Sequence, residues 1–334
     1  MITLPTVTFA DLVQGFFSKR LLQQRDVSAQ TIASYRDTFK LLLRFLHAAT
    51  GKQPSQIQLN ELTPAVIEAF LNHLESDRGN SARTRNNRFA AVRSFLTYAA
   101  AQEPTCLSTV QQVLAIPMKR FDRPQMEYLS RAEIDAILAA IDCATKSGRR
   151  DLVMFSTLYN TGARVSELTS ITVADVCLDR CASVRLHGKG RKDRSVPLWR
   201  DTVRQLKRWI KEYGGAEGSP LFPSSTGGHL TRSGVEYRLK RLVVKASAAC
   251  PALKGRKISP HTIRHTTAMH MLQSNVDITV IALWLGHESP ATTHMYVEAD
   301  LRMKERALTS LREPKTRRIR YQPGDKLLRF LEAL

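Results

Sequence analysis

Over the first hundred residues, apolar side chains recur every three or four positions, and no stretch alternates in the way a strand does. This periodicity predicts amphipathic helices over residues 31–46 and 64–74, the first of them capped by Ser28. A third predicted helix opens at Ser81 and buries its C-terminal half. We therefore expect an all-helical domain over residues 1–116.

The opening turns of the third helix are basic and rich in amides, unlike its apolar C-terminal half. The side chains concerned are Arg83, Arg85, Asn86 and Arg88. One interpretation is a DNA-facing surface, with arginines on phosphates and the asparagine on a base edge. The other is an ordinary solvated helix end. The sequence leaves both open.

Apolar periodicity stops between Ile116 and Tyr128, where prolines alternate with basic residues. That composition is typical of an extended linker, so we expect a basic interdomain linker over residues 117–128. Ser130, with Glu133 three residues later, predicts the capping box of a new helix. A second domain is expected over residues 129–310.

The second domain mixes helices with one strand pair. Residues 183–187 and 195–198 alternate apolar and polar side chains around a basic tip at 188–194, which predicts a β-hairpin. Helices are predicted at residues 152–160, 165–168, 202–213, 232–249, 260–273, 278–285 and 290–308. The expected fold class is mainly α with a small antiparallel β-sheet.

The chain carries a large positive charge, with 50 Lys and Arg against 30 Asp and Glu, a net +20. The surplus is spread, with +6 over residues 1–120, +10 over 121–310 and +4 over 311–334. A polyanion is the expected partner, most simply double-stranded DNA that the protein wraps. With 334 residues, the chain also exceeds the roughly 250 to 300 at which one core stops growing.

The five cysteines form no C-x-x-C pair and no zinc-type array with histidine, so we expect them to be reduced. The N-terminus resembles no export signal, and no long uncharged run suggests a membrane span. The expected location is the cytoplasm, in association with the nucleoid.

Two helix starts in the second domain carry chemically active side chains. Ser259 and Pro260 predict a helix start, which places His261 and Arg264 on one face of the first turns, where an anion is favoured. Gly286 is expected to end a helix before His287, and Ser289-Pro290 to start the next. Tyr296 follows about two turns later, a candidate nucleophile or an ordinary packing tyrosine.

Five motifs in order resemble the tyrosine recombinase (phage integrase) family. They are Thr161 to Leu168, Gly188 to Leu198, His261 to His265, Leu285 to His287, and Tyr296. The resemblance extends from about residue 8 to about residue 308, and is closest to mobile-element integrases. It implies a two-domain DNA clamp, with a helical core-binding domain and a catalytic domain. It also implies a tetramer on two DNA sites, with accessory proteins or partner recombinases left open.

The resemblance also implies roles for individual residues. The expected catalytic set is Arg164, Lys189, His261, Arg264, His287 and Tyr296. The two arginines would bind the scissile phosphate, the lysine would protonate the leaving oxygen, and the histidines would assist proton transfer and phosphate binding. The tyrosine would be the nucleophile, with nearby cations favouring its phenolate.

Ordinary interpretations remain beside these roles. Arg164 could pair with Glu167, which we otherwise expect to orient the site as a supporting residue. Lys189 could be a solvated loop lysine, since Arg191 and Lys192, expected DNA contacts, follow it. No metal is expected, because the histidines lack an H-E-x-x-H pattern, and no cofactor, because no phosphate-binding glycine loop is present.

The expected activity is site-specific DNA strand breakage and rejoining through a 3′-phosphotyrosyl intermediate. A type IB topoisomerase-like relaxing enzyme and a catalytically vestigial DNA-binding protein are the alternatives. Residues 311–334 form a basic tail that predicts a short helix with an apolar stripe of Leu327, Leu328, Leu331 and Leu334. The tail is expected to dock on a neighbouring protomer, or else on its own catalytic domain.

Overall fold

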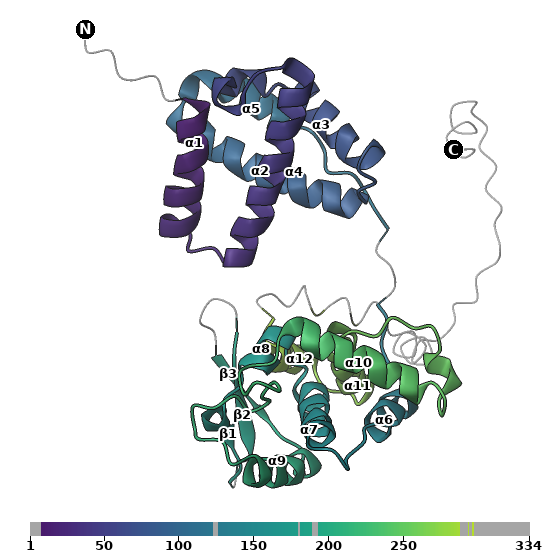
Figure 1. The fold of residues 1–334 in the computed structure, drawn as a ribbon. Coiled ribbons are helices and arrows are strands. Elements are labelled where there is room, and N and C mark those ends of the chain that lie inside the picture. Colours follow the sequence, from purple (N-terminus) through teal and green to yellow (C-terminus); the bar gives the residue numbers. More distant parts are fainter. Residues whose placement is uncertain are drawn as a thin grey trace, which may run out of the picture. The chain divides into compact units, whose positions relative to one another are not determined.

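The computed structural model describes residues 8–122, 126–179, 181–188, 193–287, 293 and 296. The chain divides into two compact units, Met1–Pro124 and Gln125–Leu334, and each has its own hydrophobic core (Figure 1). Helices dominate both, and the second adds a small antiparallel sheet. The predicted fold class is confirmed.

The first unit is helical throughout its described residues. Its elements are α1 (Phe9–Gly15), η1 (Phe16–Gln24, a π-helix), α2 (Ala29–Thr50), the 3₁₀ turns η2 (Pro54–Gln56) and η3 (Leu59–Glu61), α3 (Pro64–Ser76), α4 (Ala82–Gln102), the 3₁₀ turn η4 (Pro104–Cys106) and α5 (Leu107–Leu114). Ser28 and Ser81 cap α2 and α4, each accepting a hydrogen bond from a backbone N–H three residues on. The predicted helices are therefore confirmed, although α2 runs one turn further, to Thr50, with Gly51 as its C-cap.

Aromatic rings hold the first unit together. Phe16 is fully buried and packs against both Phe39 and Phe95, whose own ring centroids are 5.1 Å apart in an edge-to-face arrangement. Edge-to-face pairs of this kind add about 0.5–1.5 kcal/mol each beyond the buried area. The helices that carry Phe16 were not predicted, because α1 and η1 are short and their apolar spacing does not follow a single α-helical period.

The second unit contains seven α-helices in its described residues, with a three-stranded sheet at one side (Figure 1). Its elements are α6 (Arg131–Ala139), α7 (Lys146–Thr161), α8 (Val165–Ser170), η5 (Val173–Asp175), β1 (Val176–Cys177), β2 (Ser183–His187), β3 (Asp193–Pro197), α9 (Arg200–Tyr213), α10 (Arg232–Ala246), η6 (Pro251–Leu253), α11 (Pro260–Gln273) and α12 (Ile278–Leu285). The predicted capping box of Ser130 and Glu133 opens α6. Helices α11 and α12 have the predicted bounds, and α10 ends three residues early.

The sheet has the order β1-β2-β3, with all pairs antiparallel. Val184 and Leu186 on β2 and Val196 on β3 are buried, as the alternation predicted. Strand β3 starts two residues earlier than expected, because Asp193 pairs with His187 through polar side chains that carry no apolar signal. Strand β1 was missed, since two residues are too few to show a period.

The helix predicted at residues 290–308 lies outside the described residues, apart from Thr293 and Tyr296, which are both helical and buried. The tail over residues 311–334 lies outside them as well. Within the described part of the chain, no helix is both long and apolar enough to cross a membrane.

Candidate active site

Two glycines end helices at the centre of the site. Gly162 follows α7 with φ of 59°, and Gly286 follows α12 with φ of 64°, both in the left-handed region that glycine adopts without strain. Such helix ends leave backbone carbonyls unpaired. The carbonyls of Gly162, Leu285 and Gly286 instead accept hydrogen bonds from arginines.

Arg264 is the more deeply buried of the two predicted phosphate ligands, with 2 % of its surface exposed. It lies in the second turn of α11 and donates from Nη1 to the Gly162 carbonyl at 2.6 Å and from Nη2 to the Leu285 carbonyl at 2.8 Å. Burial, assisted by the charge of Arg164, lowers the pKa of Arg264 to about 10. Its guanidinium is therefore still charged at neutral pH.

Glu167 holds two further arginines. Its carboxylate, 2 % exposed, accepts from Arg164 Nη1 at 2.8 Å and from Arg194 Nη1 and Nη2 at 3.0 and 2.8 Å. It also accepts from the Arg164 backbone N–H, which completes the capping of α8. The expected ion pair between Arg164 and Glu167 is therefore also the contact through which Glu167 would orient Arg164. The Arg164 side chain remains 40 % exposed.

The protonation state of Glu167 follows from these contacts. Burial on its own would raise the pKa of this carboxyl, but the hydrogen bonds from Arg194 and from Arg164 outweigh it and hold the pKa below its usual value. The carboxylate is therefore ionised at neutral pH. Arg164 and Arg194 bond this carboxylate, and its charge also acts on Arg264, so three guanidinium groups against one carboxylate leave the cluster with a positive surplus suited to an anion.

Tyr296 lies at the far side of this cluster, with 1 % of its surface exposed. Its hydroxyl is 3.1 Å from Nδ1 of His265, one turn along α11 from His261. The rings of His261 and His265 meet edge to face, with centroids 4.2 Å apart. His261 is exposed, and the histidine in contact with the tyrosine hydroxyl is His265; the proton-transfer role of His261 stays a prediction.

His287 stacks on the Tyr296 ring, with centroids 6.2 Å apart and planes 7° from parallel. Its Nδ1 lies 2.7 Å from the Thr293 hydroxyl, three residues before the tyrosine. Burial, followed by the charges of Arg264 and Arg164, lowers the pKa of His287 to about 4. His287 therefore stays neutral at neutral pH.

The charges near Tyr296 favour its phenolate as predicted, but they do not decide the direction of its pKa shift. Arg264 and Arg164 do act in the expected direction, but burial is the larger effect and raises the pKa of Tyr296 above its usual 10. His265, whose pKa is lowered to about 4 by burial and by His261, is likewise neutral. A neutral phenol therefore lies against a neutral imidazole.

The predicted DNA-facing residues on α4 differ in their surroundings. Arg83 is exposed, whereas Arg85 is 8 % exposed and lies 3.5 Å from the Glu75 carboxylate. The Asn86 side chain makes two hydrogen bonds to the backbone of Lys119. Its Nδ2 donates to the carbonyl at 2.7 Å, and its Oδ1 accepts from the N–H at 3.1 Å.

Those contacts tie α4 to the chain that leaves the first unit. Arg88 is half-buried, with one guanidinium nitrogen that is enclosed and has no partner in the described structure. Three of the predicted residues, Lys189, Arg191 and Lys192, lie outside the described residues.

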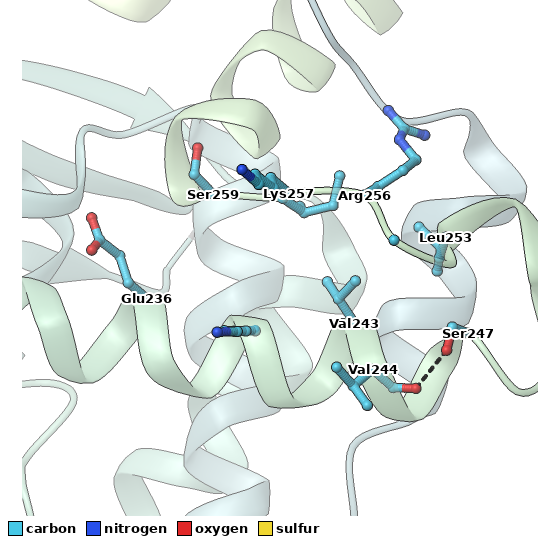
Figure 2. A pocket seen from close by; sticks show the side chains of 11 residues that line it. Glu236, Val243, Val244, Ser247, Leu253, Arg256, Lys257 and Ser259 are labelled. Atoms are coloured by element: carbon cyan, nitrogen blue, oxygen red, sulfur yellow. Dashed lines mark hydrogen bonds between the residues drawn. The ribbon is translucent and has the colours of Figure 1, made fainter. Parts of the chain in front are cut away.

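A groove of about 540 Å³ lies between α10 and the segment that leads into α11 (Figure 2). Val243 and Val244 on α10 face Leu253 across it, and it reaches Ser259, the cap of α11. None of the described residues with predicted catalytic roles lines the groove. It is therefore separate from the cluster around Tyr296.

Two members of the cluster were missed by the sequence analysis. Arg194 appeared only as part of a basic hairpin, and His265 only as a neighbour of a catalytic motif. The signal available for Arg194 was its place at the start of an alternating strand, where a charged side chain can turn back toward the sheet. His265 lies one turn after His261 on the same helix face, a spacing that pairs their rings.

Comparisons with known proteins place both units of the chain in one family. Residues 127–302 match the phage integrase family, and residues 14–103 match the phage integrase N-terminal SAM-like domain. A Sinorhizobium fredii protein described as an integrase/recombinase, y4rC, is 44 % identical over 327 residues, covering 98 % of each chain.

Two more distant proteins are also similar. The tyrosine recombinase XerD of Pseudomonas aeruginosa is 34 % identical over 241 residues, covering 69 % of this chain and 76 % of that protein. The structure of the Tn1549 transposon integrase in complex with transposon right end DNA has a TM-score of 0.69 at 17 % identity, covering 90 % of this chain and 98 % of that one. This last likeness is one of fold.

Proposed function

The chain belongs to the phage integrase family of tyrosine recombinases, and on that premise we propose that it breaks and rejoins DNA through a covalent 3′-phosphotyrosyl link to Tyr296. The observation that carries this assignment is the cluster around one buried hydroxyl. His265 contacts the hydroxyl, His287 stacks on its ring, and the charges of Arg264 and Arg164 act on it. Packing alone would require none of these polar neighbours.

The scissile phosphate binds to the arginines of the cluster. Arg164 has an exposed side, and the fork of Arg264 has more N–H donors than its two carbonyl contacts use. Both forks are held before DNA arrives, Arg164 by Glu167 and Arg264 by backbone. Preorganised charge of this kind stabilises the extra negative charge of a pentavalent phosphorus without reorganisation during the reaction.

The reaction exchanges one phosphodiester for another. The Tyr296 oxygen forms a bond to phosphorus while the bond to the 5′ oxygen breaks, and Lys189 gives that oxygen a proton. The phenol proton passes to His265, which is neutral and already in contact. Rejoining reverses each step, so the energy of the broken bond stays in the phosphotyrosyl link and no nucleotide cofactor is consumed.

Tyr296 is enclosed in the described structure, so its oxygen moves from His265 to the phosphorus once the imidazole has taken the phenol proton. The raised pKa of Tyr296 makes its proton costly to remove. That cost falls when the phosphate, bound by the arginine pair and placed for attack, replaces the buried environment around the hydroxyl. The enclosed, neutral state protects the nucleophile when no DNA is bound.

The test is the variant Tyr296→Phe. A duplex selected from random DNA by binding to this variant is nicked beside each position in turn, so that cleavage releases a short strand and traps the covalent protein–DNA adduct. Wild type should form the adduct and the variant should not, while both bind the duplex equally, because one hydroxyl adds little to many phosphate contacts. An adduct formed by the variant would contradict the assignment.

The two-domain arrangement extends this proposal. Residues 1–116 act as the core-binding domain, residues 129–310 as the catalytic domain, and 117–128 as the linker of a clamp that holds double-stranded DNA. DNA contacts come from the predicted positions, with Arg83, Arg85, Arg88, Arg191 and Lys192 on phosphates and Asn86 on a base edge. Among these, Arg83 is the exposed one on α4.

The biological role that fits best is recombination of a mobile element, by integration, excision or transposition, in a tetramer on two DNA sites. The names of y4rC and of the Tn1549 integrase support this role. The cytoplasm, close to the nucleoid, is where such a reaction takes place. A relaxing enzyme of the topoisomerase type would instead act as a monomer and remove supercoils from a plasmid without joining two sites.

A further inference from the structure

His187 is the last residue of β2 and pairs across the sheet with Asp193, the first residue of β3. Its ring lies between two carboxylates. Nε2 is 2.9 Å from Oδ1 of Asp175, in the turn η5, and Nδ1 is 3.0 Å from Oδ1 of Asp193. One imidazole therefore joins three elements at the point where the chain leaves the sheet.

The two contacts define the charge of the ring. A neutral imidazole has a single N–H, and an ionised carboxylate can only accept, so a ring that bonds two carboxylates must carry both protons. The neighbouring charges agree, because the hydrogen bonds to Asp175 and Asp193 raise the pKa of His187 above its usual 6.5. Asp175 is anchored in turn by the backbone N–H and hydroxyl of Thr172, at 2.9 and 2.8 Å.

Packing does not account for this arrangement. The His187 side chain is 44 % exposed, whereas its strand neighbours Val184 and Leu186 fill the core. Arg185, two residues back on the same face of β2, lies opposite Ser195 and adds a cation along that face. An imidazolium clamp at an exposed strand end has its main effect on the segment just beyond it, which is the hairpin tip.

We propose that the His187 imidazolium, held between Asp175 and Asp193, is a positioning residue that fixes the stem of the β2–β3 hairpin and thereby aims Lys189 at the leaving oxygen. This inference rests on the proposed function, in which Lys189 is the general acid. Lys189 follows His187 by only two residues. Loss of the last strand pair, His187 with Asp193, would therefore change the backbone position that carries the lysine. A misplacement of about 1 Å costs up to about 10²-fold in rate.

The clamp depends on pH in a defined direction. Because the carboxylates favour the protonated ring, the clamp is complete below the raised pKa of His187 and loses one of its two hydrogen bonds as pH rises through that pKa. Among the described residues, the charged groups that contact the ring are Asp175 from η5 and Asp193 from β3. Replacing Asp193 with Asn removes one of them and shifts the loss to lower pH.

The experiment separates protonation of the leaving group from other defects. Adduct formation is measured on the selected nicked duplex and on the same duplex with sulfur in place of the bridging 5′ oxygen, since a thiolate leaves without needing a proton. The proteins are full-length wild type, His187→Gln, Asp193→Asn and Lys189→Ala. The control is His73→Gln, which removes a half-buried histidine on α3 that contacts Asp77.

His187→Gln should be about 10- to 100-fold slower than wild type on the oxygen duplex and within about 3-fold of it on the sulfur duplex. Lys189→Ala should show the same pattern with a larger defect, and His73→Gln should match wild type on both. The rate advantage of wild type over His187→Gln should shrink as pH rises. The rate advantage of Asp193→Asn over His187→Gln should disappear at a lower pH than that of wild type does.

Each result has one consequence. If sulfur rescues Lys189→Ala but not His187→Gln, the histidine acts on general structure and the inference is overturned while the proposed function stands. If sulfur rescues neither, the acid role of Lys189 fails first. An advantage of wild type that stays constant with pH contradicts the protonated clamp.

Discussion

Replacing Glu167 with Gln should destabilise the second unit more than removing one charge from any of its surface-exposed ion pairs. The variant keeps the volume of the side chain but places an amide between Arg164 and Arg194, and it leaves Arg264 nearby without a compensating charge. Removal of one partner from a buried pair leaves uncompensated charge in a poorly solvated place.

The magnitude follows from the burial of each partner. A fully buried pair that loses one member costs about 3–5 kcal/mol. Glu167 is 2 % and Arg194 12 % exposed, whereas Arg164 is 40 % exposed and its share is screened by water. We therefore expect the lower end, a loss of about 3 kcal/mol in the free energy of unfolding at neutral pH.

The matched control is Glu236→Gln. Glu236 also pairs with an arginine, Arg232 at 2.8 Å, but the two are 43 % and 76 % exposed. A pair of this kind contributes about 0–1 kcal/mol. The substitution is the same at both positions, while the Glu167 carboxylate is far more buried and bonds two arginines instead of one.

Urea unfolding followed by tryptophan fluorescence is the assay, because the three tryptophans, Trp199, Trp209 and Trp284, all lie in the second unit. With a slope of about 2 kcal/mol per molar urea, the Glu167 variant should unfold roughly 1.5 M earlier than wild type, and the control within about 0.5 M of it. Equal shifts for the two variants would refute the argument from burial.

The acid limb gives a second check on Glu167. Its pKa is lower in the folded chain than its usual 4.5, so its contribution is complete above that usual value and is lost as pH falls through the folded pKa. The difference in unfolding midpoint between wild type and Glu167→Gln should therefore shrink below about pH 4.5. A difference that grows in acid would contradict an ionised Glu167.

Three other predictions concern a backbone position, DNA affinity and assembly. Gly286→Ala should lower the free energy of unfolding by about 1 kcal/mol or more beyond Gly214→Ala. Both glycines are left-handed, but of these two only the added Cβ at 286 meets a side chain, Arg194 Nη1 at 2.9 Å. Equal unfolding midpoints for the two variants would show that Arg194 moves freely. DNA affinity should fall steeply with salt, and a fragment lacking residues 1–120 should show a shallower slope of log affinity against log salt, whereas equal slopes would mean that this segment does not touch DNA. A chain ending at Arg312 should fail to form the tetrameric complex on DNA in native gels or mass photometry, and a complex equal to that of the full chain would remove the tail as an intersubunit link.

Much of the fold could be predicted from the sequence because its helices begin with strong local signals. Ser28, Ser81, Ser130 and Ser259 each cap a helix as expected, and the left-handed Gly286 ends one. Local signals failed where elements are too short to show a period, as in α1, or where polar side chains make the pair, as between His187 and Asp193.

The site was predicted in membership more than in geometry. Motif order pointed to Arg164, Arg264 and Tyr296, but the contact between Tyr296 and His265 joins positions 31 residues apart and has no local signal. The sign of the tyrosine pKa shift could not be predicted either, since it depends on whether burial or charge is larger. That balance is set by packing around the hydroxyl, which only the folded chain determines.

The two ways of holding arginine in this site differ in how they tolerate mutation. Arg264 is held by the carbonyls of Gly162 and Leu285, and a carbonyl is present whatever side chain the residue bears. A random screen for inactive proteins should then recover changes at Arg264 itself and at the left-handed glycines, but few at Leu285 that act through this contact. Arg194 and Arg164 share one carboxylate, so a single codon change at Glu167 loosens both.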